Sequence, residues 1–152
     1  MLYSFIFFSD NSLPSSKILS KTTLELDGNI IPNSGLKKSE YWLIEGSRLT
    51  MSVSDISMEN CSEYMRAIRE FKPNYIHAYA SALSLLVGYA EQQGEKFPNS
   101  IKNIFCDSET TYSWQRNLIL KSMNVNFYNI YGHTEGAGMA ITFPGSEKLE
   151  SM

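Results

Sequence analysis

The 152-residue sequence has only two cysteines and two histidines, and its longest apolar run is short. Cys61 and Cys106 form no CxxC pair and have no histidine at metal-ligand spacing, which argues against a disulfide framework and a zinc site. The apolar run at residues 1–8 lacks a basic flank and, at about 8 residues, is far shorter than the roughly 20 that span a membrane. We therefore interpret it as a buried strand and expect a cytoplasmic protein without a membrane segment.

The sequence also lacks an excess of basic charge. Its 13 basic and 16 acidic residues give a formal net charge of -3, so the overall balance attracts neither nucleic acid nor an anionic membrane surface. We expect neither as a partner. Because 43% of the residues are hydrophobic, the chain has enough apolar material for one core, which limits it to a single domain or a part of one.

The apolar pattern divides the chain into three regions of one partial domain, residues 1–152. Residues 1–50 hold short apolar stretches, at 24–26 and 41–44, between turn-rich segments, which predicts short strands joined by loops. Residues 51–143 give a stronger signal and contain the expected core. Residues 144–152 form a polar tail, which is expected to fray.

Helices and strands alternate regularly within residues 51–143. Apolar residues recur at helical spacing from Ser57 to Pro73, from Ser81 to about Gln93, and after Ser113, and each of the three serines is a favoured N-cap. The predicted strands are residues 74–79, 101–106, 125–130 and 139–143, and the expected apolar contacts of the last helix are Trp114, Leu118 and Met123.

This order contains two consecutive strand–helix–strand units. Right-handed crossovers in both units make the three strands parallel, which predicts an α/β fold with a mostly parallel, doubly wound sheet. Ligands of such sheets bind beyond the carboxyl ends of the strands. Here that edge is formed by residues 79–81, 107–109 and 131–135.

The segment Tyr131-Gly132-His133-Thr134-Glu135 concentrates polar groups at this edge. The tyrosine ring could stack on a base, and the glycine would let the backbone approach a phosphate. The threonine hydroxyl could donate to a phosphate oxygen, and the glutamate could hold Mg²⁺ near it. Phosphate and metal chemistry is therefore a reasonable hypothesis for this loop.

The motif Tyr-Gly-x-Thr-Glu, directly after a strand, resembles the adenine and metal motif of the adenylate-forming superfamily, which includes acyl-CoA and aryl-CoA ligases. Upstream, residues 71–83 (FKPNYIHAYASAL) are similar to the KP-x-x-I-x-G-Y-P-S-x-L stretch of its phenylacetate-CoA ligase-like branch, although Ala78 and Ala80 replace the usual glycine and proline. Ser108 and Glu109 stand where this branch has a Ser-Glu pair, and Arg116 follows in the next helix. The order and spacing of the three segments agree with the family over about residues 48 to 143.

The resemblance implies an enzyme that activates a carboxylic acid with Mg·ATP to an acyl adenylate and then transfers the acyl group, usually to coenzyme A. Thr134 and Glu135 would carry the chemistry, with Thr134 on the nucleotide phosphate and Glu135 as the Mg²⁺ ligand. The implied ATP or AMP contacts are Asp107, Ser108, Glu109, Tyr131, Gly132 and Thr134, with Tyr131 stacked on adenine. The implied carboxylic acid pocket is bordered by Tyr79, Ala80, Asn129 and Ile130.

Other parts of the family pattern have no counterpart in these 152 residues: the glycine-rich phosphate loop with its lysine, the ribose-binding aspartate, the hinge and the mobile C-terminal domain. The resemblance thus implies the central part of the large N-terminal domain, and we expect the chain alone to be inactive. A truncated, non-catalytic homologue that binds a partner is the alternative, and an unrelated flavodoxin-like domain is a third hypothesis. Members that activate aryl acids and members of capsular polysaccharide biosynthesis share these motifs, so the acid, the acceptor and the oligomeric state stay open.

The remaining polar residues have simpler interpretations. His77 lies inside a predicted strand and is expected to be half-buried with its hydrogen bonds satisfied, and His133 is expected to be an exposed loop residue without a catalytic role. Asp107 and Glu109 could form a carboxylate pair for acid–base chemistry, but a solvated turn is the favoured interpretation. Both cysteines are expected to be inert packing residues.

Overall fold

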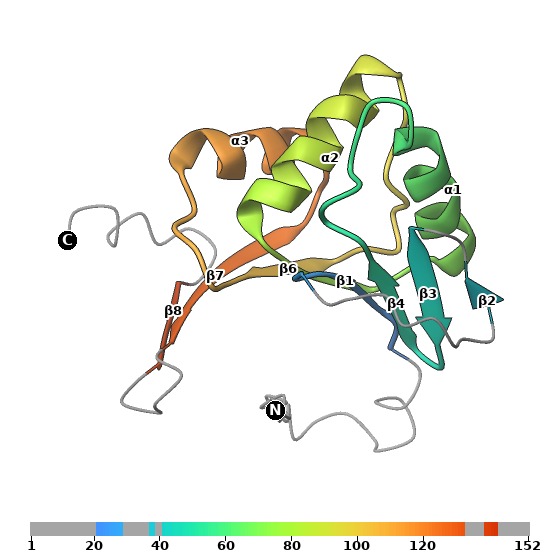
Figure 1. Ribbon diagram of the computed structural model, residues 1–152. Helices are drawn as coiled ribbons and strands as arrows, with labels where there is room; N and C mark the ends of the chain where they lie inside the picture. Colours follow the sequence, from blue (N-terminus) through green and yellow to red (C-terminus); the bar gives the residue numbers. More distant parts are fainter. Residues whose placement is uncertain (1–20, 29–36, 39–40, 133–138, 143–152) are drawn as a thin grey trace.

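The computed structural model describes residues 21–28, 37–38, 41–132 and 139–142. These residues form one eight-stranded sheet and three helices (Figure 1). The strand predicted at residues 1–8, the tail at 144–152 and three residues of the motif, His133, Thr134 and Glu135, lie outside the described residues.

The sheet is mixed, with a parallel centre. Its spatial order is β2-β3-β4-β1-β5-β6-β7-β8, in which β4, β1, β5, β6 and β7 run parallel and β2, β3 and β8 are antiparallel to their neighbours. The three strands of the predicted strand–helix–strand units are therefore adjacent and parallel, as expected. The strand bounds are β1 Thr23–Leu26, β2 Lys37–Lys38, β3 Trp42–Glu45, β4 Arg48–Met51, β5 Tyr75–Ala78, β6 Asn103–Cys106, β7 Asn126–Gly132 and β8 Met139–Thr142.

The three predicted helices are present, with different starting residues. Helix α1 is Cys61–Phe71, α2 is Ala80–Gln92 and α3 is Ser113–Ser122. The N-cap residues are Asn60, Tyr79 and Tyr112, so none of the three predicted serine caps is the N-cap. Ser57 instead accepts a hydrogen bond from the backbone N–H of Asn60.

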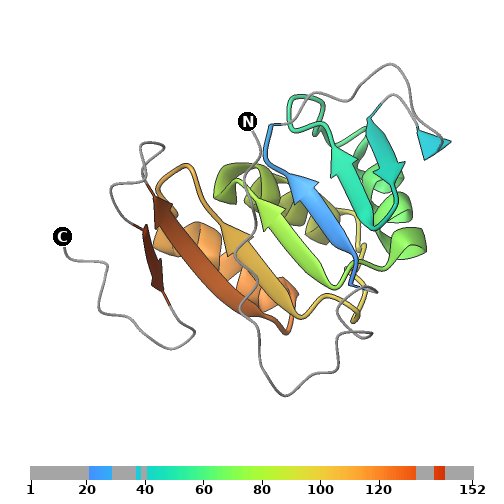
Figure 2. The same cartoon turned by 90° about the horizontal axis from the view of Figure 1, so that it is seen from below.

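The three helices cover one face of the sheet (Figures 1 and 2). The chain passes from β4 to β5, from β5 to β6 and from β6 to β7 in the same direction across the sheet, with one helix in each connection. Successive right-handed crossovers in one direction place their helices on the same side. The expected α/β class with a mostly parallel sheet is confirmed, and within the described ranges the helical layer is single.

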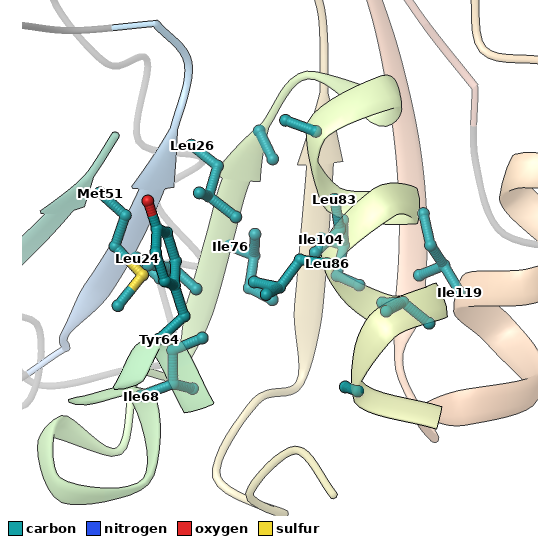
Figure 3. Packing of buried hydrophobic residues seen from close by; sticks show 14 of the residues in the cluster. Leu24, Leu26, Met51, Tyr64, Ile68, Ile76, Leu83, Leu86, Ile104 and Ile119 are labelled. Atoms are coloured by element: carbon teal, nitrogen blue, oxygen red, sulfur yellow. The ribbon is translucent and has the colours of Figure 1, made fainter. Parts of the chain in front are cut away.

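The core lies between this helical layer and the sheet (Figure 3). Alternate strand residues point toward the helices, as the register shows for the row Leu49, Leu24, Ile76, Ile104 and Phe127 on five neighbouring strands. All five are buried. The helices contribute Tyr64 and Ile68 from α1, Leu83 and Leu86 from α2, and Ile119 from α3.

One expected core contact of α3 is wrong. Met123 is buried and Leu118 is half-buried, but Trp114 is 62% exposed. Trp114 is the second residue of α3, and the buried residues of that helix, Gln115 and Ile119, lie on a neighbouring face. A helical spacing that fits a sequence does not by itself say where the buried face is centred.

The opposite face of the sheet carries a second, more polar row. Thr50, Glu25, His77, Phe105 and Tyr128 are register partners on the same five strands. Their side chains point away from the helices, because neighbouring strand residues point to opposite faces. The aromatic rings of Phe105 and Tyr128 stack with centroids 4.9 Å apart. In β1, β5 and β6 this row lies one residue before the end of the strand, next to the carboxyl edge of the sheet.

Candidate functional site at the carboxyl edge of the sheet

Four parallel strands end side by side at the edge where ligands of α/β sheets bind. Strands β1, β5, β6 and β7 are followed or terminated there by residues 27–28, 79–81, 107–109 and 131–132. Two of the predicted site segments and residues 131–132 of the third thus lie on the same edge, as expected from their order in the sequence. Asp27 and Gly28, which follow β1, join them and were not part of the prediction.

Glu109 connects the loop after β6 with the start of α2. Its carboxylate oxygens accept a hydrogen bond from the backbone N–H of Ser81, at 2.5 Å, and another from the Ser81 hydroxyl, at 2.9 Å. The first N–H groups of a helix have no partner within the helix, and the N-cap residue Tyr79 makes no side-chain hydrogen bond to them. Glu109 therefore caps α2 from a neighbouring loop and fixes the two loops to each other.

His77 lies between two carboxylates, one from the loop after β1 and one from the loop after β6, the strands on either side of β5. Its Nε2 is 2.9 Å from Oδ2 of Asp107, and its Nδ1 is 3.6 Å from Oδ2 of Asp27. The side chains of His77 and Asp27 are 18% and 17% exposed, so these charges are only partly screened by water. The expected half-buried histidine is confirmed and its Nε2 is hydrogen-bonded to Asp107, whereas the 3.6 Å between Nδ1 and Asp27 is longer than a hydrogen bond. The two carboxylates lie on either side of β5.

The charges of this cluster change the pKa values of both partners. Burial alone lowers the pKa of His77, but the hydrogen bond and charge of Asp107, together with Asp27 and Glu25, outweigh it, and the net pKa is raised. The hydrogen bond from His77 lowers the pKa of Asp107. The interpretation of Asp107 as part of a solvated turn is therefore wrong, because its carboxylate is half-buried and ion-paired. The second carboxylate, Glu109, is exposed, as expected for a turn.

Glu25 extends the cluster along the open face of the sheet. Its side chain is 5% exposed, and its Oε1 is 2.9 Å from Nε of Arg48 on the neighbouring strand. Burial raises the pKa of Glu25, and the charge of Arg48 opposes that shift. The hydroxyl of Thr50 also lies 3.5 Å from Oε2 of Glu25. Negative groups thus outnumber positive ones around His77.

Tyr79 packs the end of β5 against the end of β1. Its backbone N–H donates to the carbonyl of Leu26 at 2.9 Å, and its ring lies against Gly28, where a β-carbon would be 3.1 Å from the ring. Gly28 has a φ of 81°, a conformation that glycine adopts without strain. Burial and the charges of Asp27, Asp107 and Glu109 raise the pKa of Tyr79, so Tyr79 lies among the loops of this edge.

The predicted site residues at the end of β7 alternate between the two faces of the sheet. Asn129 shares the helix-side face with buried Phe127, and its amide oxygen accepts a hydrogen bond from the Thr111 hydroxyl at 3.2 Å. Ile130 points to the opposite face. Tyr131 returns to the helix side and is 63% exposed, so one aromatic surface is accessible there. Gly132 ends β7 and is exposed.

The predicted pocket residues differ in accessibility. Ala80 is fully buried as the first residue of α2, whereas Tyr79, Asn129 and Ile130 are partly exposed. Ser108 is exposed and has a φ of 64°, which turns the loop after Asp107 so that Glu109 reaches Ser81. Thr134 and Glu135, the residues predicted to carry the chemistry, lie outside the described residues.

The described residues do not form a magnesium site. Mg²⁺ takes oxygen ligands from carboxylates, but Asp107 is paired with His77 and Glu109 is bound to Ser81. Among residues 21–28, 37–38, 41–132 and 139–142, no group of three or more His, Cys, Asp and Glu residues could hold a metal ion. The predicted ligand, Glu135, is not among them.

The main residues that the sequence prediction missed are His77, as an organising group, and its partner Asp27. A signal was present: Asp27 and Asp107 each follow a short strand directly, and His77 is one residue before the end of another. Their meeting depends on β1 lying beside β5. The sequence pattern did not predict that neighbour, because three strands and helix α1 separate β1 from β5 along the chain.

Comparisons with known proteins show the fold. No protein-family model and no curated protein matches this sequence. Among solved structures, VinN in complex with L-aspartate matches with a TM-score of 0.56 and 14% identity, covering 86% of this chain and 32% of VinN. IdnL1 matches with a TM-score of 0.50 and 11% identity, covering 84% of this chain and 27% of IdnL1.

A long-chain-fatty-acid-CoA ligase (FadD1) from Archaeoglobus fulgidus also matches, with a TM-score of 0.49 and 18% identity, covering 64% of this chain and 20% of the ligase. The fold of the chain is similar to that of VinN and IdnL1 over most of its length, and the chain spans about a third of VinN. No helix in the described part of the chain is long and apolar enough to cross a membrane.

Proposed function

We propose that the chain is the central part of an adenylate-forming ligase of the phenylacetate-CoA ligase-like branch, and that its carboxyl edge binds the nucleotide. The observation that carries this proposal is the meeting of three motif segments on one edge. Residues 79–81, 107–109 and 131–132 come from separate parts of the sequence and end three adjacent parallel strands. A chance motif match would not require this proximity.

In the proposed reaction, a carboxylate oxygen of the acid attacks the α-phosphorus of ATP. The new bond joins the acid to AMP, and the bond to pyrophosphate breaks. A thiol, such as that of coenzyme A, then attacks the acyl carbon and releases AMP. Under this proposal Glu135 would hold Mg²⁺, which would supply electrophilic assistance at the phosphate together with Thr134, and the pocket for the acid would be bordered by Tyr79, Ala80, Asn129 and Ile130.

The described residues support a binding role rather than proton transfer. Tyr131 offers an exposed aromatic face at the end of β7, and stacking on a base needs such a face. The Glu109–Ser81 contact fixes the neighbouring loop, so the edge is ordered before a ligand arrives. The L-aspartate bound to VinN favours an acid that also carries an amino group as the first substrate to screen. A cytoplasmic location is a further part of the proposal.

The direct experiment is a titration of the chain with AMP, followed by two-dimensional NMR of the backbone amides. Tyr131→Ala should weaken AMP binding by about tenfold, because stacking of a base on an aromatic ring contributes about 1–3 kcal/mol, and Tyr131→Phe should retain most of the affinity. The matched control is Tyr112→Ala, since Tyr112 is 59% exposed and Tyr131 is 63% exposed. Equal losses in the Tyr131→Ala and Tyr112→Ala variants would refute the assignment of Tyr131.

A further inference from the structure

His77 occupies a variable position of the motif stretch at residues 71–83 and lies beside three loops of the proposed nucleotide site. It lies at the end of β5, between Asp27 after β1 and Asp107 after β6. Asp27 precedes Gly28, against which the Tyr79 ring packs. Asp107 precedes Ser108 and Glu109, whose carboxylate caps α2. The position of one imidazole ring therefore affects the loops after β1, β5 and β6 together.

The number of protons on His77 determines how many carboxylates it can bind. A doubly protonated imidazole has two N–H donors, whereas the neutral ring has one donor and one acceptor. With both protons, Nε2 donates to Asp107 and Nδ1 faces Asp27 with a positive charge. With one proton, one of the two carboxylates faces a nitrogen lone pair, and the attraction on that side is lost.

The surrounding charges favour the doubly protonated form. Glu25 and Asp27 face His77 from the β1 side, Asp107 faces it from the loop after β6, and Tyr79 directly follows β5. Arg48 from β4 balances Glu25, at 2.9 Å. Two carboxylates then remain opposite one histidine, so its positive charge also lowers the net negative charge of an edge that is proposed to receive an anionic nucleotide.

We propose that His77 is a positioning residue of the nucleotide site: when doubly protonated it bridges Asp27 and Asp107 and holds residues 107–109 in the binding geometry, and its deprotonation releases one side of the bridge. This inference rests on the proposed nucleotide-binding function. It predicts that the edge binds a nucleoside more tightly at acidic than at alkaline pH. Because linkage is reciprocal, a bound nucleoside must also make His77 hold its proton more tightly.

Adenosine is the suitable probe, because it has no phosphate whose own ionisation would vary over the pH range of the experiment. Adenosine binding to the folded chain is measured by NMR at about pH 5.5 and about pH 8.5, on either side of the histidine titration. The wild-type affinity should fall at least about fivefold at the higher pH, the low end of couplings between linked sites. His77→Gln keeps one N–H donor for Asp107 but cannot gain a proton, and its affinity should not vary with pH.

Two measurements separate positioning from general structural damage. The chain has only two histidines, so the imidazole signals that disappear in His77→Gln identify His77, and its titration can be followed directly. Asp107→Asn should lower the titration midpoint of His77. The control is Glu70→Gln, an exposed charge change on α1, which should leave both the midpoint and the pH dependence unchanged.

The outcomes distinguish this inference from the function on which it rests. If adenosine binds with a pH dependence that His77→Gln removes, the inference is supported. Binding that is equally strong at both pH values, a pH dependence that persists in His77→Gln, or an unchanged His77 midpoint in Asp107→Asn overturns the inference and leaves the proposed function standing. Failure of the wild-type chain to bind adenosine at either pH refutes the nucleotide site itself, and the inference with it.

Discussion

The contact between Glu109 and Ser81 allows a quantitative test of how the carboxyl edge is held together. Glu109→Ala removes the acceptor of two hydrogen bonds at the start of α2, and the side chain of the N-cap residue Tyr79 makes no capping hydrogen bond there. Loss of a cap costs about 0.5–2 kcal/mol, and a carboxylate near a helix N-terminus contributes about 0.3–1 kcal/mol. Because Glu109 is exposed, we expect Glu109→Ala to lower the free energy of unfolding by about 1 kcal/mol, in the lower half of the range for a lost cap.

The assay is urea denaturation followed by circular dichroism, with the free energies of unfolding compared in a double-mutant cycle. Ser81→Ala removes the hydroxyl but keeps the backbone N–H, so it should cost less than Glu109→Ala, and the two losses should not add. Glu70→Ala is the control, since Glu70 is also an exposed glutamate on a helix. If Glu109→Ala and Glu70→Ala cost the same, or if Glu109→Ala and Ser81→Ala add fully, the described cap does not stabilise the fold.

Three further predictions follow from packing and titration. Leu83→Ala should cost about 2.7–5 kcal/mol of unfolding free energy because Leu83 is fully buried, whereas Leu85→Ala, 42% exposed on the same helix, should cost far less; equal losses in urea denaturation would contradict the assigned face of α2. The raised pKa of His77 means that its stabilisation is complete below its usual value of 6.5 and is lost as pH rises through the raised value. The chain should therefore melt at a lower temperature at about pH 8.5 than at about pH 6, and an equal or higher melting temperature at the alkaline pH would refute this sign. Burial raises the pKa of the Cys106 thiol to about 12, so iodoacetamide should modify it only after unfolding, and rapid modification of the native chain, located by mass spectrometry, would exclude the buried position.

The order of strands and helices in residues 51–143 could be predicted because each element carries a local signal. Residues 74–79 and 101–106 are short apolar segments between helical stretches with clear stops, such as Pro73. Helix starts were predicted less well, because the structure uses Asn60, Tyr79 and Tyr112 as N-caps instead of the nearby serines. The cap of α2 comes from Glu109, 28 residues away from Ser81, and a local pattern does not contain such a partner.

The same limit explains what was missed at the site. The three motif segments were found because each contains its own residues in order. The His77 cluster depends on β1 lying between β4 and β5, which follows from the packing of the whole sheet. Its members are separated by 50 residues between Asp27 and His77 and by 30 between His77 and Asp107. Residues at such separations are brought together only by the tertiary fold.

The central claim is that the carboxyl edge of the sheet binds an adenine nucleotide. The most direct measurement is a titration of the isotope-labelled chain with AMP, with the amide shifts mapped onto the structure and GMP as the comparison ligand. We predict saturable shifts at residues 79–81, 107–109 and 131–132, with weaker shifts for GMP. Shifts that are absent, that do not saturate, or that gather at the amino ends of the strands would contradict the claim.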